Sequence, residues 1–237
     1  MTMEIIEKNN GKVVFITDMS TTLANAIRRS ASEIPILAIE EADIYKNDTA
    51  LYDEIIAHRL GLIPLKNQKV KEGEAIELKL KAKGKGERTE VLSGALGEEV
   101  VYSDMPIVLL EDGQELEIVA RAKAGKGKDH ARYSPGLVFY KHLAKVKISG
   151  DGEKQTELAE LYPQAFEVVG GKLKVKDATK CDLEQEDLKE YPGITIELKD
   201  ELVFSIESWG QIDAKEIFNG ACKALKANLA DVSKALK

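Results

Sequence analysis

The residue types that most often carry out chemistry are sparse in this sequence, and their spacing does not favour it. The three histidines, His58, His130 and His142, never occupy positions i and i+4 of one helix, the spacing that lets two imidazoles share a metal ion. Cys181 and Cys222 have no histidine near them and form no Cys-x-x-Cys pair. The sequence therefore predicts neither a metal site nor a catalytic centre.

Two lysine–glycine runs, at 83–86 and 126–128, superficially resemble phosphate-binding loops. Neither has the glycine spacing that directs successive backbone N–H groups at a phosphate before a helix begins. We interpret both as basic hairpin tips. The sequence also lacks the G-x-x-x-x-G-K-[ST], G-x-G-x-x-G and G-x-S-x-G motifs, which disfavours a stand-alone enzyme.

Two basic segments suit binding better than catalysis. Arg28 and Arg29 lie side by side on a predicted helix, about 100° apart around its axis, so both flank its apolar stripe. They form either a solvated surface or an anchor for a partner's carboxylates. The segment 121–136 is either an RNA-binding loop or a basic loop that docks on an acidic protein. Its basic and aromatic residues include Lys123, Lys126, Lys128, His130, Arg132 and Tyr133.

The elements that position these segments follow from hydrophobic periodicity. Asn10-Gly11 joins two β-rich runs, which predicts a hairpin. A helix is expected from Ser20 or Thr21 to Pro35, and a shorter one over Tyr52–Leu60. The inward-facing residues expected on these helices are Leu23, Ile27, Ala31 and Ile34, and Ile55, Ile56 and Leu60.

The middle of the chain alternates short β-rich runs with glycine-containing turns. The strands expected there are Ile76–Lys83, Glu90–Leu92, Val100–Tyr102, Ile107–Leu110, Glu115–Ala122 and Leu137–Ile148. A second hairpin is expected around Gly170-Gly171, and Ile194–Leu198 and Val203–Glu207 are expected to be separate strands.

The last 25 residues predict a long amphipathic helix. Asp213 and Glu216 have the spacing of a capping box. A helix of about 24 residues spans roughly 36 Å, longer than a small domain needs. Its stripe packs either in the chain's own core or against a partner chain. The stripe consists of Ile217, Ala221, Leu225, Leu229, Val232 and Leu236.

Composition narrows the class of protein. The 237 residues carry a net charge of −7, which disfavours a protein that coats DNA. The basic segment is an exception, because residues 121–147 hold eight basic residues and one acidic residue. The longest apolar runs fall far short of the roughly 20 residues of a membrane span. With no secretory signal visible, we expect a cytoplasmic protein without membrane contact.

Three separated motifs give the chain a family resemblance. The first is LANAIRR at 23–29 with EIP at 33–35, AIE at 38–40 and LYDEIIAHRLGLIPL at 51–65. The second is RAKAGKGKDHARYSPG at 121–136, and the third is FSIESWG at 204–210 before the last helix. In this order, over nearly the whole chain, they resemble the alpha-like subunits of cellular RNA polymerases. Within them, the archaeal D-type family is the most similar.

The resemblance implies a fold and a function. It implies an α+β fold with a discontinuous dimerisation domain over 1–42 and 199–237, an inserted β-rich domain over 43–150 and a small ferredoxin-like domain over 151–198. It also implies a heterodimer with subunit L, which serves as the platform for the small subunits N and P and the large B-type subunit. The complex is a DNA-directed nucleotidyltransferase, but this chain is expected to have no active site and no direct contact with nucleic acid.

The candidate interface residues form three groups. Candidates for packing against subunit L or in the adjoining core are Leu23, Ile27, Ile217, Ala221, Leu225 and Leu229. The residues in stretches that resemble the family's surface for the second-largest polymerase chain are Arg28, Arg29, Glu54, His58 and Arg59. The residues in the stretch that resembles the loop meeting other subunits are Lys126, Lys128, His130, Arg132 and Tyr133.

One departure from the family concerns a cofactor. Many members hold a cubane iron–sulfur cluster in the third domain with four cysteine thiolates. Residues 151–198 contain only Cys181, and one thiolate cannot hold such a cluster. The sequence therefore predicts no cluster and an ordinary apolar core in its place. The residues expected in that core are Phe166, Val168, Val169, Leu173, Val175, Leu183 and Leu188.

Overall fold

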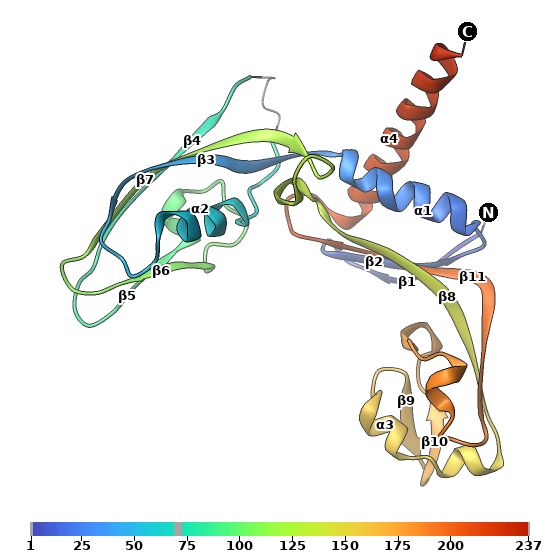
Figure 1. Cartoon of the computed structure of the whole chain (residues 1–237). Coiled ribbons are helices and arrows are strands. Elements are labelled where there is room, and N and C mark those ends of the chain that lie inside the picture. The colour runs from blue at the N-terminus through green and yellow to red at the C-terminus, as the bar shows by residue number, and fades with distance from the viewer. Residues whose placement is uncertain (1, 69–72, 237) are drawn as a thin grey trace. The chain divides into compact units, whose positions relative to one another are not determined.

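The computed structural model describes residues 2–68 and 73–236 and has a mixed α+β fold, as predicted (Figure 1). The chain divides into two compact units. The first unit comprises residues 1–8, 14–24 and 139–205, and the second comprises 9–13, 25–138 and 206–237. The four domain ranges expected from the family resemblance stay predictions. No helix within the described ranges is long and apolar enough to cross a membrane.

A four-stranded sheet contains the strands that dominate the first unit. Its order is β1 (Met3–Lys8), β2 (Lys12–Thr17), β11 (Ile194–Ser208) and β8 (Gly136–Ile148). The β1–β2 hairpin confirms the Asn-Gly prediction, and the Asn9 side chain accepts a 2.7 Å hydrogen bond from the Lys12 N–H at the turn. On this sheet Phe204 stacks against Phe15 and Tyr140.

The prediction of two strands over 194–207 was wrong, because β11 is one strand of 15 residues. The polar residues 199–201 interrupt its hydrophobic pattern without interrupting the strand. His142 of β8 reaches this stretch, with its Nδ1 2.7 Å from the Lys199 carbonyl oxygen. Hydrophobic periodicity alone does not detect a strand that continues through exposed polar positions.

The first unit also contains a small apolar core within residues 144–196. It is built from α3 (Glu157–Leu161) and the antiparallel pair β9 (Phe166–Val169) and β10 (Lys172–Val175). The predicted core residues that are buried here are Phe166, Leu173, Leu183 and Leu188, with Val175 half-buried. Val168 and Val169 were wrongly assigned to this core: they are 47% and 43% exposed at the end of the hairpin.

The second unit is built on an antiparallel three-stranded sheet of order β3 (Pro35–Asn47), β7 (Glu115–Lys126) and β4 (Ile76–Lys83). A second pair, β5 (Thr89–Leu92) and β6 (Pro106–Leu110), accompanies it. Strand β7 extends beyond its predicted end at Ala122, because it pairs with β3 as far as Pro35. The strand predicted over Val100–Tyr102 is reduced to a single bridge between Val100 and Leu65.

Helix α2 (Asp53–Gly61) packs on the core of the second unit. Ile56 and Leu60 are completely buried, as predicted. Ile55 was wrongly predicted to face inward, since its side chain is 47% exposed. Neighbouring helical residues point about 100° apart. A helix that rests on the core with one narrow face therefore buries only one of two adjacent isoleucines.

The two remaining helices carry half of the candidate interface residues. Helix α1 (Thr21–Ser30) begins as predicted, and the Ser20 hydroxyl accepts a hydrogen bond from the Leu23 N–H. Helix α4 (Ala214–Ala235) has Asp213 at its N-cap position. The predicted capping box is absent, because the Asp213 side chain makes no capping hydrogen bond.

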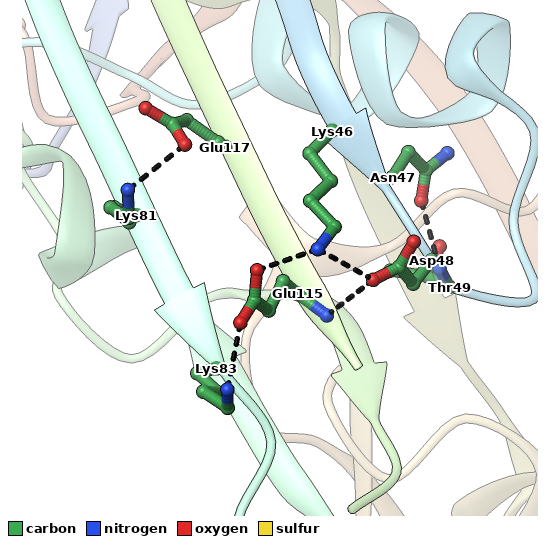
Figure 2. Close-up of polar contacts among 8 residues, drawn as sticks. All are labelled: Lys46, Asn47, Asp48, Thr49, Lys81, Lys83, Glu115 and Glu117. Carbon is green, nitrogen blue, oxygen red and sulfur yellow. Dashed lines mark hydrogen bonds and ion pairs between the residues drawn. The ribbon is translucent and has the colours of Figure 1, made fainter. Parts of the chain in front are cut away.

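One face of the β3–β7–β4 sheet carries a row of ion pairs (Figure 2). Glu115 of β7 lies between two lysines, with its carboxylate oxygens 2.6 Å from Lys46 Nζ and 2.8 Å from Lys83 Nζ. Hydrogen bonds from Lys46 and then Lys83 lower the pKa of Glu115 from 4.5 to about 2. Glu117, two residues further along β7, has Lys81 as its partner at 3.0 Å.

We expect Glu115→Gln to lower stability at pH 7 but not in strong acid. Because the folded-state pKa of Glu115 lies below its ordinary value, its contribution is complete above about pH 4.5. That contribution is lost as the pH falls through the folded-state value of about 2. Urea midpoints measured from pH 7 to pH 2 should therefore converge for the wild type and the variant. Glu117→Gln is the control, because it removes one ion pair instead of two; a constant gap for Glu115→Gln across this range would contradict the account.

Candidate subunit interface

The burial of α4 changes sharply along its length. Ile217 and Ala221 are buried, and Gly220 lies so close to Ile34 that an added Cβ would come within 2.9 Å of its Cδ1. Leu225 is half-buried, and Leu229 is 61% exposed. The same stripe continues through Val232 and Leu236, which are 57% and 83% exposed. The N-terminal half of α4 therefore belongs to the chain's own core, while its C-terminal half presents an apolar stripe to solvent.

Helix α1 presents its two arginines on its last turn. Ile27 is only 4% exposed, so it is a core residue of this chain, whereas Leu23 is 38% exposed. Both Arg28 and Arg29 are exposed. The Arg28 guanidinium donates to the Asn25 side-chain oxygen at 3.1 and 2.9 Å, which holds it against the helix.

The candidate residues of α2 differ in their accessibility. Glu54 and His58 are exposed and point away from the core residues Ile56 and Leu60. Arg59 is half-buried, and its Nη2 donates a 2.8 Å hydrogen bond to the Pro106 carbonyl at the start of β6. Arg59 therefore ties α2 to the β5–β6 pair.

Lys126 and Lys128 converge on one carboxylate. Each Nζ lies 3.2 Å from Glu33 Oε2, in the short helical turn after α1. Burial alone would raise the pKa of Glu33, but hydrogen bonds from Lys126 and Lys128 lower it overall. The two lysines therefore fix the end of β7 and the following turn to residue 33.

Other cations of the basic segment are also neutralised within the chain. Lys123 pairs with Glu40 and Glu41 of β3, at 2.8 and 3.0 Å. Arg121 pairs with Asp43 on the same strand. Because β3 supplies these carboxylates beside β7, the positive charge of the segment is compensated where the two strands run side by side. This arrangement disfavours an RNA-binding loop, which needs uncompensated charge for phosphates.

The end of the basic segment is built around Arg132 and Tyr133. Arg132 Nη1 donates to the carbonyls of Ile39 and Glu40, at 3.0 and 3.1 Å. The exposed His130 accepts a 3.1 Å hydrogen bond from the Arg132 N–H. Tyr133 is only 6% exposed, so the tyrosine predicted at an interface contributes to the core of this chain. Lys126, Lys128, His130 and Arg132 stay predicted contacts for other subunits.

The two cysteines are free. Cys181 is 3% exposed in the small core of the first unit, and burial raises the pKa of its thiol. Cys222 is half-buried on α4, and burial raises the pKa of its thiol too. Within the described ranges, no three histidine, cysteine or acidic side chains gather as metal ligands would.

One feature was missed by the sequence predictions. Leu62, Tyr102 and Trp209 are large apolar residues that remain 56%, 46% and 45% exposed, and all three line one groove. They come from three segments far apart in the sequence. Only the presence of a single tryptophan in the chain, in a Trp-Gly turn, could have drawn attention to this place.

The sequence of this chain matches one protein family model and is similar to several known proteins. The family model of the RNA polymerase Rpb3/Rpb11 dimerisation domain matches residues 13–229 of this chain. The chain is similar to DNA-directed RNA polymerase subunit Rpo3 of Pyrococcus horikoshii, with 36% identity over 94% of this chain and 93% of that protein. Rpo3 of Thermococcus kodakarensis is 34% identical over 94% and 92%. Rpo3 of Methanothermobacter thermautotrophicus is 32% identical over 95% of each chain.

Proposed function

Because this chain belongs to the family of alpha-like RNA polymerase subunits that carry the Rpb3/Rpb11 dimerisation domain, we propose that it is a non-catalytic assembly subunit of an archaeal polymerase. In this role it forms a heterodimer with subunit L in the cytoplasm. The heterodimer then serves as the platform for the small subunits N and P and for the large B-type subunit. The dimerisation domain is formed by 1–42 and 199–237, with a β-rich insertion over 43–150 and a ferredoxin-like domain over 151–198.

The observation that carries this proposal is the exposed stripe on α4. Leu229, Val232 and Leu236 continue the buried stripe of Ile217 and Ala221 at helical spacing, yet each is more than half exposed. An apolar stripe several turns long is costly to leave in water. A partner subunit with a matching apolar surface removes that cost, as obligate interfaces do.

Co-expression with subunit L tests the proposal. We expect a 1:1 complex that survives gel filtration at micromolar concentration, and a lone chain that aggregates or melts at lower temperature. The alternative is a nucleic-acid-binding module that acts through residues 121–132. A monodisperse lone chain that ignores subunit L and binds RNA with a steep salt dependence would establish that alternative instead.

Charge reversal on α1 tests the surface assigned to the large B-type subunit. Arg28→Glu with Arg29→Glu should weaken binding of this large subunit to the heterodimer by about tenfold or more. The two arginines that would pair with the partner's carboxylates are replaced by carboxylates, which repel them. The heterodimer itself should form unchanged. Arg28→Lys with Arg29→Lys is the control, since it keeps both charges. If pull-downs recover the large subunit equally with all three proteins, this face of α1 is not the contact.

An iron–sulfur cluster does not fit residues 151–198 of this chain. The residues 151–198 supply one thiolate, and Cys181 is packed among apolar side chains. We propose that Phe166, Leu173 and their neighbours replace a cluster as the core of this region.

Iron chelators should therefore leave the melting temperature of this protein unchanged. The test is calorimetry of anaerobically purified protein with and without a strong iron chelator, together with its absorption spectrum. We expect coincident melting curves and no band near 400 nm. A brown protein whose melting temperature falls with chelator would overturn this expectation.

A further inference from the structure

The groove that contains Trp209 has a volume of about 420 Å³ and lies within the second unit. Leu62, Tyr102, Met105 and Trp209 contribute its apolar surface, and Arg132 and Gln211 contribute polar groups. Three of the four apolar residues are about half exposed. Exposed large side chains are common singly, but several that share one hollow mark a binding surface.

Local structure fixes the shape of the groove. The Trp209 N–H donates to the Pro135 carbonyl at 3.2 Å, and the Gly210 N–H donates to the Ser208 hydroxyl at 2.8 Å. Gly210 has a φ of 96°, and a Cβ there would lie 2.8 Å from the Tyr102 hydroxyl. Only glycine therefore lets the turn approach Tyr102 so closely. The backbone that carries Trp209 is therefore fixed close to Tyr102.

Two polar residues of the groove each lack one kind of partner within the described residues: the Gln211 side-chain oxygen lacks a hydrogen bond, and Arg132 lacks a counter-charge. Gln211 is only 9% exposed, and its Oε1 has no hydrogen-bond partner among the residues that the structure describes. Leaving a buried acceptor unpaired costs about 1–3 kcal/mol. Arg132 is bound to two carbonyls and to His130, and the described parts of the chain offer its charge no carboxylate partner.

We infer that the Trp209 groove binds an extended peptide segment of another polymerase subunit, with an apolar side chain beside Trp209 and a carboxylate facing Arg132. Tryptophan, tyrosine and arginine are the residue types that most often dominate protein interfaces. Gln211 also lines this groove, and a primary amide both donates and accepts hydrogen bonds. A guanidinium that has only neutral partners attracts a carboxylate. The inference rests on the proposed assembly function.

Trp209 provides its own probe, because it is the only tryptophan in the chain. Overlapping synthetic 15-residue peptides, taken from the other polymerase subunits of the same organism, are titrated onto the heterodimer while its emission is recorded. The Trp209→Phe heterodimer supplies the background. We expect one group of overlapping peptides to shift the Trp209 emission. Replacing their acidic residues by amides should weaken their binding at least tenfold.

Two variants of equal exposure test the groove in the assembled complex. Leu62→Asp changes its wall, whereas Leu198→Asp changes a leucine that is also 56% exposed but belongs to the first unit. We expect both to form the heterodimer, and only Leu62→Asp to fail to retain one of the later subunits when the polymerase is reconstituted. If both assemble completely, or if no peptide shifts the Trp209 emission, the inference is wrong. If neither the variants nor the wild type pairs with subunit L, the proposed function itself fails.

Discussion

Leu229→Asp is expected to abolish the heterodimer while the lone chain keeps its fold. The Leu229 side chain is 61% exposed in this chain, so its replacement disturbs little of the chain's own packing. In the heterodimer the same position loses about 1.5–3 kcal/mol of apolar burial and places a carboxylate in an apolar contact. Together these effects correspond to at least about a hundredfold weaker association. Size-exclusion chromatography of the co-expressed subunits measures it.

The control for this experiment lies on the opposite side of the same helix. Ala227 is exposed. Because it lies two positions from both Leu225 and Leu229, its side chain points away from the stripe. Ala227→Asp adds the same charge to α4 and should leave the heterodimer intact. If both variants associate normally, the C-terminal half of α4 is not the interface. If both fail, the effect is one of charge on the helix and not of the stripe.

Ile56→Ala is expected to lower the stability of the second unit by about 2–5 kcal/mol. Ile56 of α2 is completely buried in the core that also contains Leu60 and Leu37. The smaller side chain leaves a cavity that this packed core cannot fill. Because Trp209 lies in the same unit, its emission during urea unfolding reports the loss.

The neighbouring isoleucine is the matched control. Ile55→Ala removes the same atoms one residue away, at a side chain that is 47% exposed. We expect Ile55→Ala to lower the free energy of unfolding by well under half as much as Ile56→Ala. Equal losses would mean that α2 is rotated so that Ile55 also faces the core, and that Glu54 and His58 face other directions.

Local signals predicted local structure well. The Asn-Gly and Gly-Gly hairpins form where expected, and β4 has the predicted bounds Ile76–Lys83. These features depend on the residue types in a turn and on the alternation of apolar and polar residues in a strand. Both can be recognised from a few consecutive residues. The errors occur where tertiary contacts decide. Strand β7 is longer than its hydrophobic pattern predicts, because its last residues form backbone pairs with β3. Strand β11 continues through polar residues.

The candidate site divides in the same way. The apolar stripe of α4 was visible in the sequence, but not the point at which it leaves the core between Ala221 and Leu229. Tyr133 looked like a contact residue and is buried, because the fold places Gly125 over its ring. The ion pairs between the basic segment and β3 join residues about 80 positions apart, which no periodicity reveals. The Trp209 groove likewise exists only once distant segments have met.

Amide hydrogen exchange over α4, measured in the lone chain and in the complex with subunit L, tests the central claim most directly. We expect amides in the second half of the helix, from about residue 225 to 235, to exchange readily in the lone chain and to become strongly protected in the complex. Amides around Ile217 and Ala221 should be protected in both, since they already lie in the core. Equal exchange of the second half of α4 in the two samples would contradict the claim that its exposed stripe is the dimerisation surface.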